Sequence, residues 1–286
     1  MLLQASEMPL QADGSVYHLN LQPEDVASKI ILVGDPARVA MVSSFFDTIE
    51  IKKQNREIHT HTGSYKGKRI TILSTGMGTD NIDIVLNELD ALVNIDLQKR
   101  RIKDTHTTLE LIRIGTCGAL QTDIAINTCI ASRYGFGMDG LLHTYRHENI
   151  SDEAMVEAFI RQCGRNDKLP YPYAVACSDE LMQRIAPDLR QGITLTAQGF
   201  YAPQCRELRL PLAQGDFIKK LQGWSYRNLY FTNMEMETSA LYALSRLLGH
   251  KALTLCIAIA NRVNKDFSAD YKPAMQQLIV QVLERF

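Results

Sequence analysis

Hydrophobic residues in this chain form short, nearly continuous runs that alternate with longer stretches of helical spacing. The short runs are rich in β-branched residues, which is typical of strands covered on both faces of a sheet. They predict strands at Lys29–Val33, Arg69–Ser74, Leu109–Ile114, Thr128–Ser132, Tyr173–Cys177, Ile193–Thr196 and Ala252–Ala260.

Between these runs, apolar residues recur three or four positions apart, which is the period of an amphipathic helix. This spacing predicts helices over residues 82–93, 241–248 and 275–283, and Gly249 is a C-terminal stop signal for the second. Strands that alternate with helices indicate an α/β fold with a mixed or mainly parallel sheet. Because no stretch of sequence marks a boundary, we expect one domain over residues 1–286.

Composition and charge limit the partners that this chain is expected to have. Its 31 lysines and arginines are balanced by 32 acids, which argues against a basic protein that coats nucleic acid. Its 6 cysteines form no CxxC pair and suggest reduced thiols. No secretory signal is evident, and no run approaches the roughly 20 apolar residues of a membrane span. We expect a soluble, cytoplasmic protein.

Three of the predicted strands run into segments that contain glycine. These segments are Gly34–Arg38, Thr75–Gly78 and Gly115–Gly118. In open α/β sheets, ligands gather beyond the carboxyl ends of strands, and glycine lets backbone N–H groups approach them closely. Arg38 and Arg113 have planar donor groups that suit phosphate oxygens, and Thr116 adds a hydroxyl. Together these segments predict an anion site without the P-loop lysine.

Arg113 is central to this prediction because it lies within the apolar stretch Leu-Ile-Arg-Ile-Gly. A guanidinium group that is partly buried there needs an anionic partner. That partner is either a bound oxyanion or an internal carboxylate such as Asp35, and the sequence leaves both open. Each glycine segment taken alone is more often an ordinary strand-to-helix turn.

Two further segments suggest contacts with a sugar and a base. Glu237 ends the run Asn233–Glu237 just before an apolar helix. Glutamates there either stabilise the helix start through its dipole or, as the alternative, accept from the two hydroxyls of a sugar diol. The segment Phe200–Arg206 places an aromatic ring beside an amide and a guanidinium group, which suits a flat heterocycle, although alone it is more often a surface loop.

Histidine pairs at His59 and His61 and at His143 and His147 raise the possibility of a metal. The first pair alternates along an apparent strand, and the second lacks the glutamate of an HExxH motif. Without converging cysteines or acids, we favour surface histidines and expect no catalytic metal. The basic run over residues 98–103 is interpreted as a solvated face rather than a contact for an acidic partner.

These segments, in their order along the chain, resemble the nucleoside phosphorylase family, and most closely its uridine phosphorylase branch. The matching segments are Val16–Leu19, Gly34–Val39, Arg56–Glu57, Ser74–Gly78, Arg113–Gly118, Phe200–Tyr201, Gln204 with Arg206, Met234–Glu237 and Asn261–Arg262. They span residues 16 to 262. The resemblance implies a three-layer αβα fold with a central mixed β-sheet.

The resemblance also implies a role for individual residues. The phosphate site corresponds to Gly34, Arg38, Arg113 and Thr116, with Arg56 supplied by a neighbouring subunit. The ribose site corresponds to Glu237, Met236 beneath the sugar, and His18, which crosses the subunit interface. The base site corresponds to Phe200, Gln204 and Arg206.

The implied reaction is phosphorolysis of uridine to uracil and ribose 1-phosphate in pyrimidine nucleoside salvage, by a homo-oligomeric pentosyltransferase. Arg38, Arg113, Arg206 and Glu237 would be the catalytic residues, inorganic phosphate the co-substrate, and no organic cofactor is needed. A dimer, or a hexamer built as a trimer of dimers, would share its active sites. The alternatives are a purine phosphorylase or a hydrolytic nucleosidase on the same fold, or a non-catalytic nucleoside-binding module.

Uridine is preferred because Gln204 and Arg206 resemble the pair that reads the uracil edge. Purine-specific relatives carry an aspartate after the last core strand, whereas residues 259–263 here contain no acid. Asp266 lies further along and matches poorly.

Other positions depart from the family pattern. Cys117 and Met234 stand where threonine and tyrosine are common. Some relatives bind a monovalent cation near the residue matching Glu57, but Asn81 here replaces the serine involved. Residues 95–107 look like an insertion.

Overall fold

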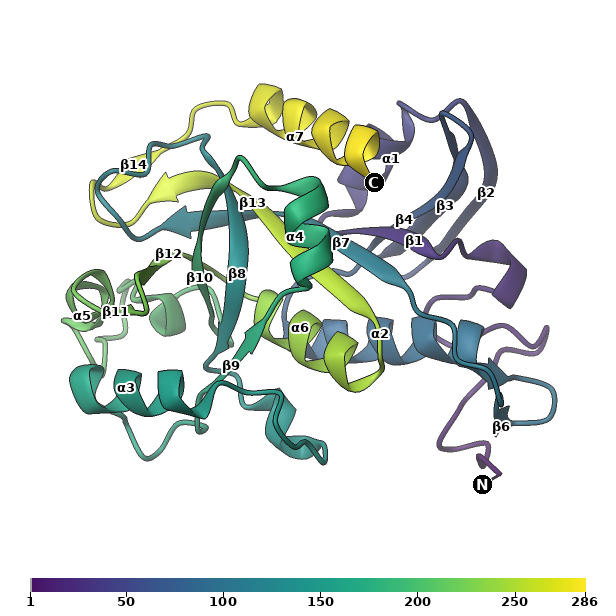
Figure 1. Cartoon of the computed structure of the whole chain (residues 1–286), viewed down its shortest axis with the longest axis horizontal. Helices are drawn as coiled ribbons and strands as arrows, with labels where there is room; N and C mark the ends of the chain where they lie inside the picture. Colours follow the sequence, from purple (N-terminus) through teal and green to yellow (C-terminus); the bar gives the residue numbers. More distant parts are fainter. Residues whose placement is uncertain (1) are drawn as a thin grey trace.

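A single mixed sheet of 12 strands forms the centre of the computed structural model, which describes residues 2–286. Its main path runs in the order β11-β12-β10-β8-β13-β7-β1-β4-β3-β2, with β9 beside β8 and β14 beside β13 (Figure 1). The strands are β1 (Lys29–Val33), β2 (Thr48–Asn55), β3 (Ile58–Tyr65), β4 (Lys68–Ser74), β7 (Glu110–Ala119), β8 (Cys129–Gly137), β9 (Tyr173–Ala176), β10 (Arg190–Thr196), β11 (Ser225–Tyr226), β12 (Leu229–Glu235), β13 (Lys251–Asn261) and β14 (Asp266–Phe267).

Parallel pairing brings the carboxyl ends of several strands to one edge of this sheet. β1 pairs in parallel with β4 and β7, and β7 pairs in parallel with β13. β12 pairs in parallel with β10 and also, antiparallel, with the end of β7, where Met234 lies opposite Gly118. Because of this second pairing, strands β7, β13, β8, β10 and β12 form a closed circuit.

Helices cover both faces of the sheet. α2 and α6 pack against each other, and in Figure 1 they lie on the opposite side of β7 and β13 from α7. The helices are α1 (Pro36–Ser43), α2 (Thr79–Asn94), α3 (Glu153–Cys163), α4 (Asp179–Ile185), α5 (Phe217–Gln222), α6 (Thr238–Leu247) and α7 (Lys272–Arg285). The short 3-10 helices are η1 (Pro23–Asp25), η2 (Leu141–Thr144) and η3 (Ala202–Gln204).

The predicted helices are present, because their apolar residues form the buried faces of α2, α6 and α7. Gly249 follows α6 with a φ of 75°, a left-handed conformation that ends the helix as its sequence signal predicted. No helix within residues 2–286 is long and apolar enough to cross a membrane.

The sheet differs from the predicted strands in two ways: β2 and β12 were not predicted, and β7 is longer than expected. The strand was expected to end at Ile114, but it continues to Ala119, so Gly115–Gly118 lie inside the strand rather than in a turn. Pairing with β13 on one side, and with β12 at the end of β7, holds this glycine-rich segment extended.

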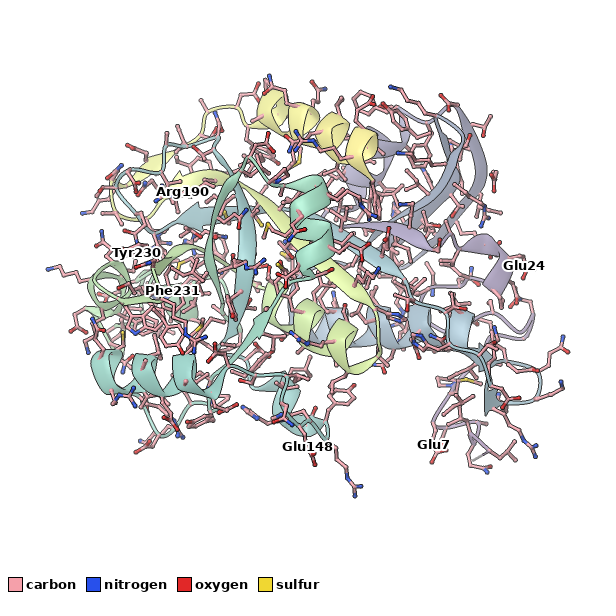
Figure 2. All side chains as sticks on the ribbon, in the orientation of Figure 1. Glu7, Glu24, Glu148, Arg190, Tyr230 and Phe231 are labelled. Atoms are coloured by element: carbon pink, nitrogen blue, oxygen red, sulfur yellow. The ribbon has the colours of Figure 1, made fainter. Side chains whose placement is uncertain are left out.

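A second apolar cluster supports the edge of the sheet that carries β12. Phe231 of β12, labelled in Figure 2, lies against the rings of Phe136, Phe159 and Trp224, with centroids 5.3, 5.8 and 5.0 Å away. Aromatic pairs at such distances contribute about 0.5–1.5 kcal/mol each beyond their burial. This packing fixes β12, whose last residue is Glu235.

The apparent insertion over residues 95–107 contains a small hairpin, made of β5 (Ile95–Asp96) and β6 (Arg101–Ile102). It is joined to the N-terminal segment, because Leu3 N–H donates to the Arg100 carbonyl at 3.0 Å and the Arg100 guanidinium donates to the Met8 carbonyl at 2.7 Å. The hairpin therefore anchors the start of the chain.

Candidate active site

A cavity of about 450 Å³ opens at the edge of the sheet where β1, β4, β7, β12 and β13 end. Most of the residues that the sequence assigned to a site line this one cavity. They are Gly34, Arg38, Arg113, Thr116, Phe200, Gln204, Arg206, Met236 and Glu237. Two others, His18 and Arg56, do not line it.

Arg38 and Arg113 lie close together in this cavity. Arg38, in the first turn of α1, donates from Nη1 to the Ile114 carbonyl at 3.1 Å. Burial lowers the pKa of Arg38, and the positive charge of Arg113 lowers it further. The Nε groups of both arginines are buried without a hydrogen-bond partner within residues 2–286. A buried and a half-buried cation, each with an unused donor, have the charge and donor groups that suit an oxyanion.

The internal partners of Arg113 are Glu237 and Glu235, so the suggested pairing with Asp35 is wrong. Arg113 donates from Nη2 to Glu237, and its Nη1 lies 3.5 Å from a Glu235 oxygen. Burial alone would lower the pKa of Arg113, but Glu237 and then Glu235 outweigh it and raise that pKa. Asp35 instead caps α1 by accepting from the Ala37 N–H at 2.9 Å.

The glycine at position 115 makes room for this ion pair. A Cβ atom built there would lie 2.1 Å from Arg113 Nη1 and 3.0 Å from Cys256 Sγ. Arg113 also donates to that sulfur at 3.7 Å. The guanidinium group therefore occupies the space that any other residue at position 115 would fill.

The two glutamates before α6 have different roles in the structure. Glu235 accepts from the backbone N–H groups of Glu237 and Thr238, both at 3.0 Å, so Glu235 stabilises the start of the helix. Glu237 makes no cap and lines the cavity, where it accepts from Gly78 N–H at 2.8 Å and from Arg113. The capping interpretation of this segment therefore applies to Glu235, and the ligand interpretation applies to Glu237.

Glu235 also lines the cavity and was not among the residues assigned from sequence. Burial raises the pKa of Glu235 to about 7; Arg113 opposes this rise and Glu237 adds to it. Glu235 also accepts a hydrogen bond from the Thr196 hydroxyl at 2.8 Å. Glu235 thus holds β10, β12 and the start of α6 in register around the ion pair.

A second group of side chains in the cavity comes from the segment after β10. Arg206 donates from Nη1 to the Phe200 carbonyl and to Gln204 Oε1, both at 2.7 Å, and its guanidinium carbon lies 3.8 Å from the centre of the Phe200 ring. Burial, with the nearby charge of Arg262, lowers the pKa of Arg206 to about 10. This arrangement offers an amide, a cation and a ring to one planar ligand.

Residues 259–263 add no acid to the cavity. Asn261 is buried and donates to the carbonyls of Gln121 and Ile124 at 2.9 and 2.8 Å, so its amide has a structural role. Asp266 does not line the cavity, although its neighbour Phe267 does. Cys117 and Met234, which depart from the family pattern, both line it, and burial raises the pKa of the Cys117 thiol.

His18 and Arg56 lie together outside the cavity. The Asn55 amide donates to the His18 carbonyl at 2.9 Å, and His18 Nδ1 lies 2.5 Å from Glu88. The Arg56 guanidinium lies 5.9 Å from the centre of the Tyr17 ring, and Arg56 itself is exposed. This His18–Arg56 group therefore belongs to one outer surface of the molecule.

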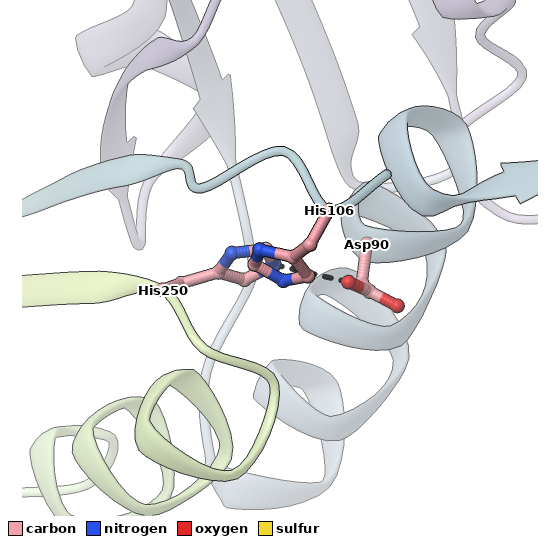
Figure 3. A group of neighbouring side chains, drawn as sticks. All are labelled: Asp90, His106 and His250. Carbon is pink, nitrogen blue, oxygen red and sulfur yellow. Dashed lines mark ion pairs between the residues drawn. The ribbon is translucent and has the colours of Figure 1, made fainter. Parts of the chain in front are cut away.

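Within residues 2–286, one group of three side chains has the composition of a metal site, and it lies elsewhere. Asp90, His106 and His250 converge where the insertion meets the end of α6 (Figure 3). His250 Nδ1 accepts from the Leu109 N–H at 3.2 Å, so the proton of the neutral ring is on Nε2, 3.2 Å from Asp90. A metal on Nε2 would require that proton to leave. The group instead ties the insertion to the end of α6, through the approach of His250 Nε2 to Asp90 and through His106 Nε2, which lies 2.8 Å from the Leu248 carbonyl.

One histidine of each pair noted in the sequence is bound to a protein group. His61 Nδ1 lies 2.7 Å from the Ser43 hydroxyl, and His143 Nε2 lies 2.8 Å from the Tyr171 carbonyl. Near Glu57, which lines the cavity, the Asn81 amide donates to the carboxylate at 3.5 Å.

Comparison with known proteins agrees with the fold. Residues 28–284 match the family model for the phosphorylase superfamily. The chain belongs to this superfamily. The resemblance seen in the sequence is thereby confirmed, as is the mixed α/β fold with helices on both faces of a central sheet.

Several superfamily members are similar over most of their length. A uridine phosphorylase of Thermococcus kodakarensis is 30% identical over 92% of this chain and 83% of its own. A DeoD-type purine nucleoside phosphorylase of Oceanobacillus iheyensis is 28% identical over 83% of this chain and 84% of its own. The crystal structure of a Trypanosoma brucei nucleoside phosphorylase, described as showing uridine phosphorylase activity, has a TM-score of 0.86 and 28% identity, covering 97% and 99% of the two chains.

Proposed function

We propose that this chain catalyses the phosphorolysis of uridine to uracil and ribose 1-phosphate. The observation that carries this proposal is that a single cavity contains a pair of arginines, a glutamate bonded to one of them, and the group Phe200, Gln204 and Arg206. These are the contacts that a phosphate, a pentose and a uracil ring require. The similarity to a uridine phosphorylase supports the same substrate.

Phosphate would bind where the donors of Arg38 and Arg113 converge, with the Thr116 hydroxyl and the backbone at Gly34 completing the site. Its oxygen attacks the anomeric carbon of the ribose while the bond from that carbon to N1 of uracil breaks. The sugar passes through an oxocarbenium-like state, and the phosphate charge stabilises it. Glu237 holds the 2′- and 3′-hydroxyls, with Met236 beneath the ring.

The electron pair of the broken bond goes to uracil, which leaves with negative charge on its nitrogens and oxygens. Arg206 and Gln204 stabilise this charge more strongly in the transition state than in the substrate, which is what accelerates the reaction. A purine instead needs a proton as it leaves, and no acid from residues 259–263 lines the cavity. The reaction uses no organic cofactor.

We further propose that the His18–Arg56 group completes the cavity of a neighbouring copy in a homo-oligomer. Arg56 is exposed and lies outside the cavity of its own chain. In a partner, Arg56 would contact the phosphate and His18 the ribose 5′-hydroxyl. A monomer would then lack two ligands. In the cell, the enzyme would serve pyrimidine nucleoside salvage in the cytoplasm.

The test is the release of uracil from uridine with and without added orthophosphate, with inosine assayed in parallel. We expect uracil only when orthophosphate is present, together with ribose 1-phosphate and little hypoxanthine from inosine. Uracil without orthophosphate would indicate a hydrolytic nucleosidase, and preferred cleavage of inosine a purine phosphorylase. Binding of uridine without release of uracil under either condition would indicate a non-catalytic module.

A further inference from the structure

A second cavity, of about 430 Å³, lies at the opposite end of α6 from the first. It is enclosed by β8, β9, α4, the last turn of α6 and the first residues of β13, and it shares no lining residue with the first cavity. Its walls carry three cations, Arg133, Arg246 and Lys251, and a single acid, Asp179. The lining residues alone have an excess of two positive charges, and Glu180, which pairs with Lys251, reduces this excess to one.

Two adjacent residues of this wall, the exposed Arg246 and the buried Ser245, carry polar groups without a protein partner within residues 2–286. Arg133 lies 2.6 Å from Asp179, and Lys251 lies 2.7 Å from Glu180, but Arg246 makes no ion pair or side-chain hydrogen bond within residues 2–286. Ser245 is 1% exposed, and its hydroxyl has no hydrogen-bond partner there. A buried hydroxyl without a partner is costly, and a ligand that accepts from it removes that cost.

The charge and shape of this cavity favour a phosphate ester. Such a group carries about −1.5 to −2 charges at pH 7, and Arg246 is a cation of the wall that pairs with no acid within residues 2–286. The two arginines have planar donor groups that suit phosphate oxygens. The cavity also falls within the ~300–1,000 Å³ that is usual for organic ligands.

The rest of the wall indicates what the ester carries. Ser178 and Tyr134 are among its remaining lining residues. The Ser178 hydroxyl caps α4 by accepting from Leu181 N–H, whereas the Tyr134 hydroxyl makes no hydrogen bond within residues 2–286 and suits a hydroxylated ligand. We propose that this cavity binds a sugar phosphate monoester, with the phosphate between Arg133 and Arg246 and near Ser245. The proposal stands whether or not the first cavity is a phosphorylase site, because it rests on different residues.

The test is calorimetric titration of the full-length protein with ribose 5-phosphate, which has no nucleoside bond to cleave. We expect the Arg246→Gln and Arg133→Gln variants to lose about tenfold or more in affinity, as is usual when a charged hydrogen bond is removed. Ser245→Ala should also weaken binding. Thermal melting of each variant separates loss of binding from loss of folding, and for Ser245→Ala no loss of stability is expected.

Two control variants locate the binding site. Arg161→Gln changes an exposed arginine on α3 whose ion-pair partner is Glu157, and its affinity should match the unmodified protein. Arg38→Gln removes a cation from the first cavity and should leave this affinity unchanged. Affinity lost in Arg38→Gln but kept in Arg246→Gln would overturn the proposal, because the ligand would then occupy the first cavity.

Two further titrations test the chemical class of the ligand. In the Arg38→Gln variant, whose first cavity lacks a ligand for phosphate, orthophosphate alone and ribose alone should each bind more weakly than ribose 5-phosphate. Equal affinity for orthophosphate would show that the sugar makes no contact and would refute a sugar phosphate site. No heat of binding from ribose 5-phosphate in the unmodified protein would refute it as well.

Discussion

Replacing Arg206 with alanine tests the proposed recognition of uracil most directly. Arg206 has no ion-pair partner within residues 2–286, although Arg262 lies close enough to lower the pKa of Arg206 to about 10. It therefore stays protonated at pH 7, and its charge is not neutralised by the protein. An unneutralised, half-buried cation favours a ligand that becomes negative during the reaction.

The structure sets the size of the expected effect. Nη1 of Arg206 is already used by the Phe200 carbonyl and Gln204, which leaves Nε and Nη2 without a partner within residues 2–286. Loss of one such donor to a developing anion costs ~10²–10³-fold in kcat, or about 2.7–4 kcal/mol. Loss of contact with the Phe200 ring adds about 0.5–1 kcal/mol, which should affect binding of the base.

The assay is the initial rate of base release at saturating phosphate, with uridine and with 5-fluorouridine. Fluorine makes the departing base a more stable anion, so the kcat loss of Arg206→Ala should be smaller for 5-fluorouridine. Arg209→Ala, which changes an exposed arginine in the same loop, is the matched control and should keep full activity. Full activity of Arg206→Ala on uridine, or equal losses on both substrates, would refute the reasoning.

Three further changes test the ion pair beneath the proposed phosphate site. Glu237→Ala leaves Arg113 without its main partner in a buried site, so the free energy of unfolding measured in urea should fall by about 3–5 kcal/mol. The pKa of Glu235 is raised from 4.5 to about 7 in the folded protein. The contribution of Glu235 to stability is therefore full below pH 4.5 and is lost as the pH rises through 7. The Glu235→Gln variant should lack this dependence of stability on pH between pH 4.5 and 8. Gly115→Ala should displace Arg113 and raise the KM for phosphate about tenfold or more, whereas Gly215→Ala, where a Cβ has no neighbour within 4 Å, should leave it unchanged.

The sequence was informative where burial alone decides structure. β1 and β13 are buried along most of their length and appear as continuous apolar runs, so both were predicted. β2 was not predicted, because it alternates exposed and half-buried residues and carries two lysines. The end of β7 was also missed, because glycine usually breaks strands and only the pairing with β12 and β13 holds these residues extended.

The anion site was predicted because side chains that follow strand ends gather at one edge of a parallel sheet, whereas the ribose and base roles came from the family resemblance. That reasoning brought Arg38 and Arg113 together, but it could not identify the partners of Arg113, because Glu235 and Glu237 lie more than 120 residues away in the chain. The sequence allowed either a bound anion or an internal carboxylate as that partner, and the structure makes these roles compatible. Glu237 occupies Nη2, and Nε of each arginine has no partner within residues 2–286. Arg113 can therefore hold the glutamate that we assign to ribose and, at the same time, an oxyanion shared with Arg38, so the same guanidinium group would align the attacking phosphate with the sugar.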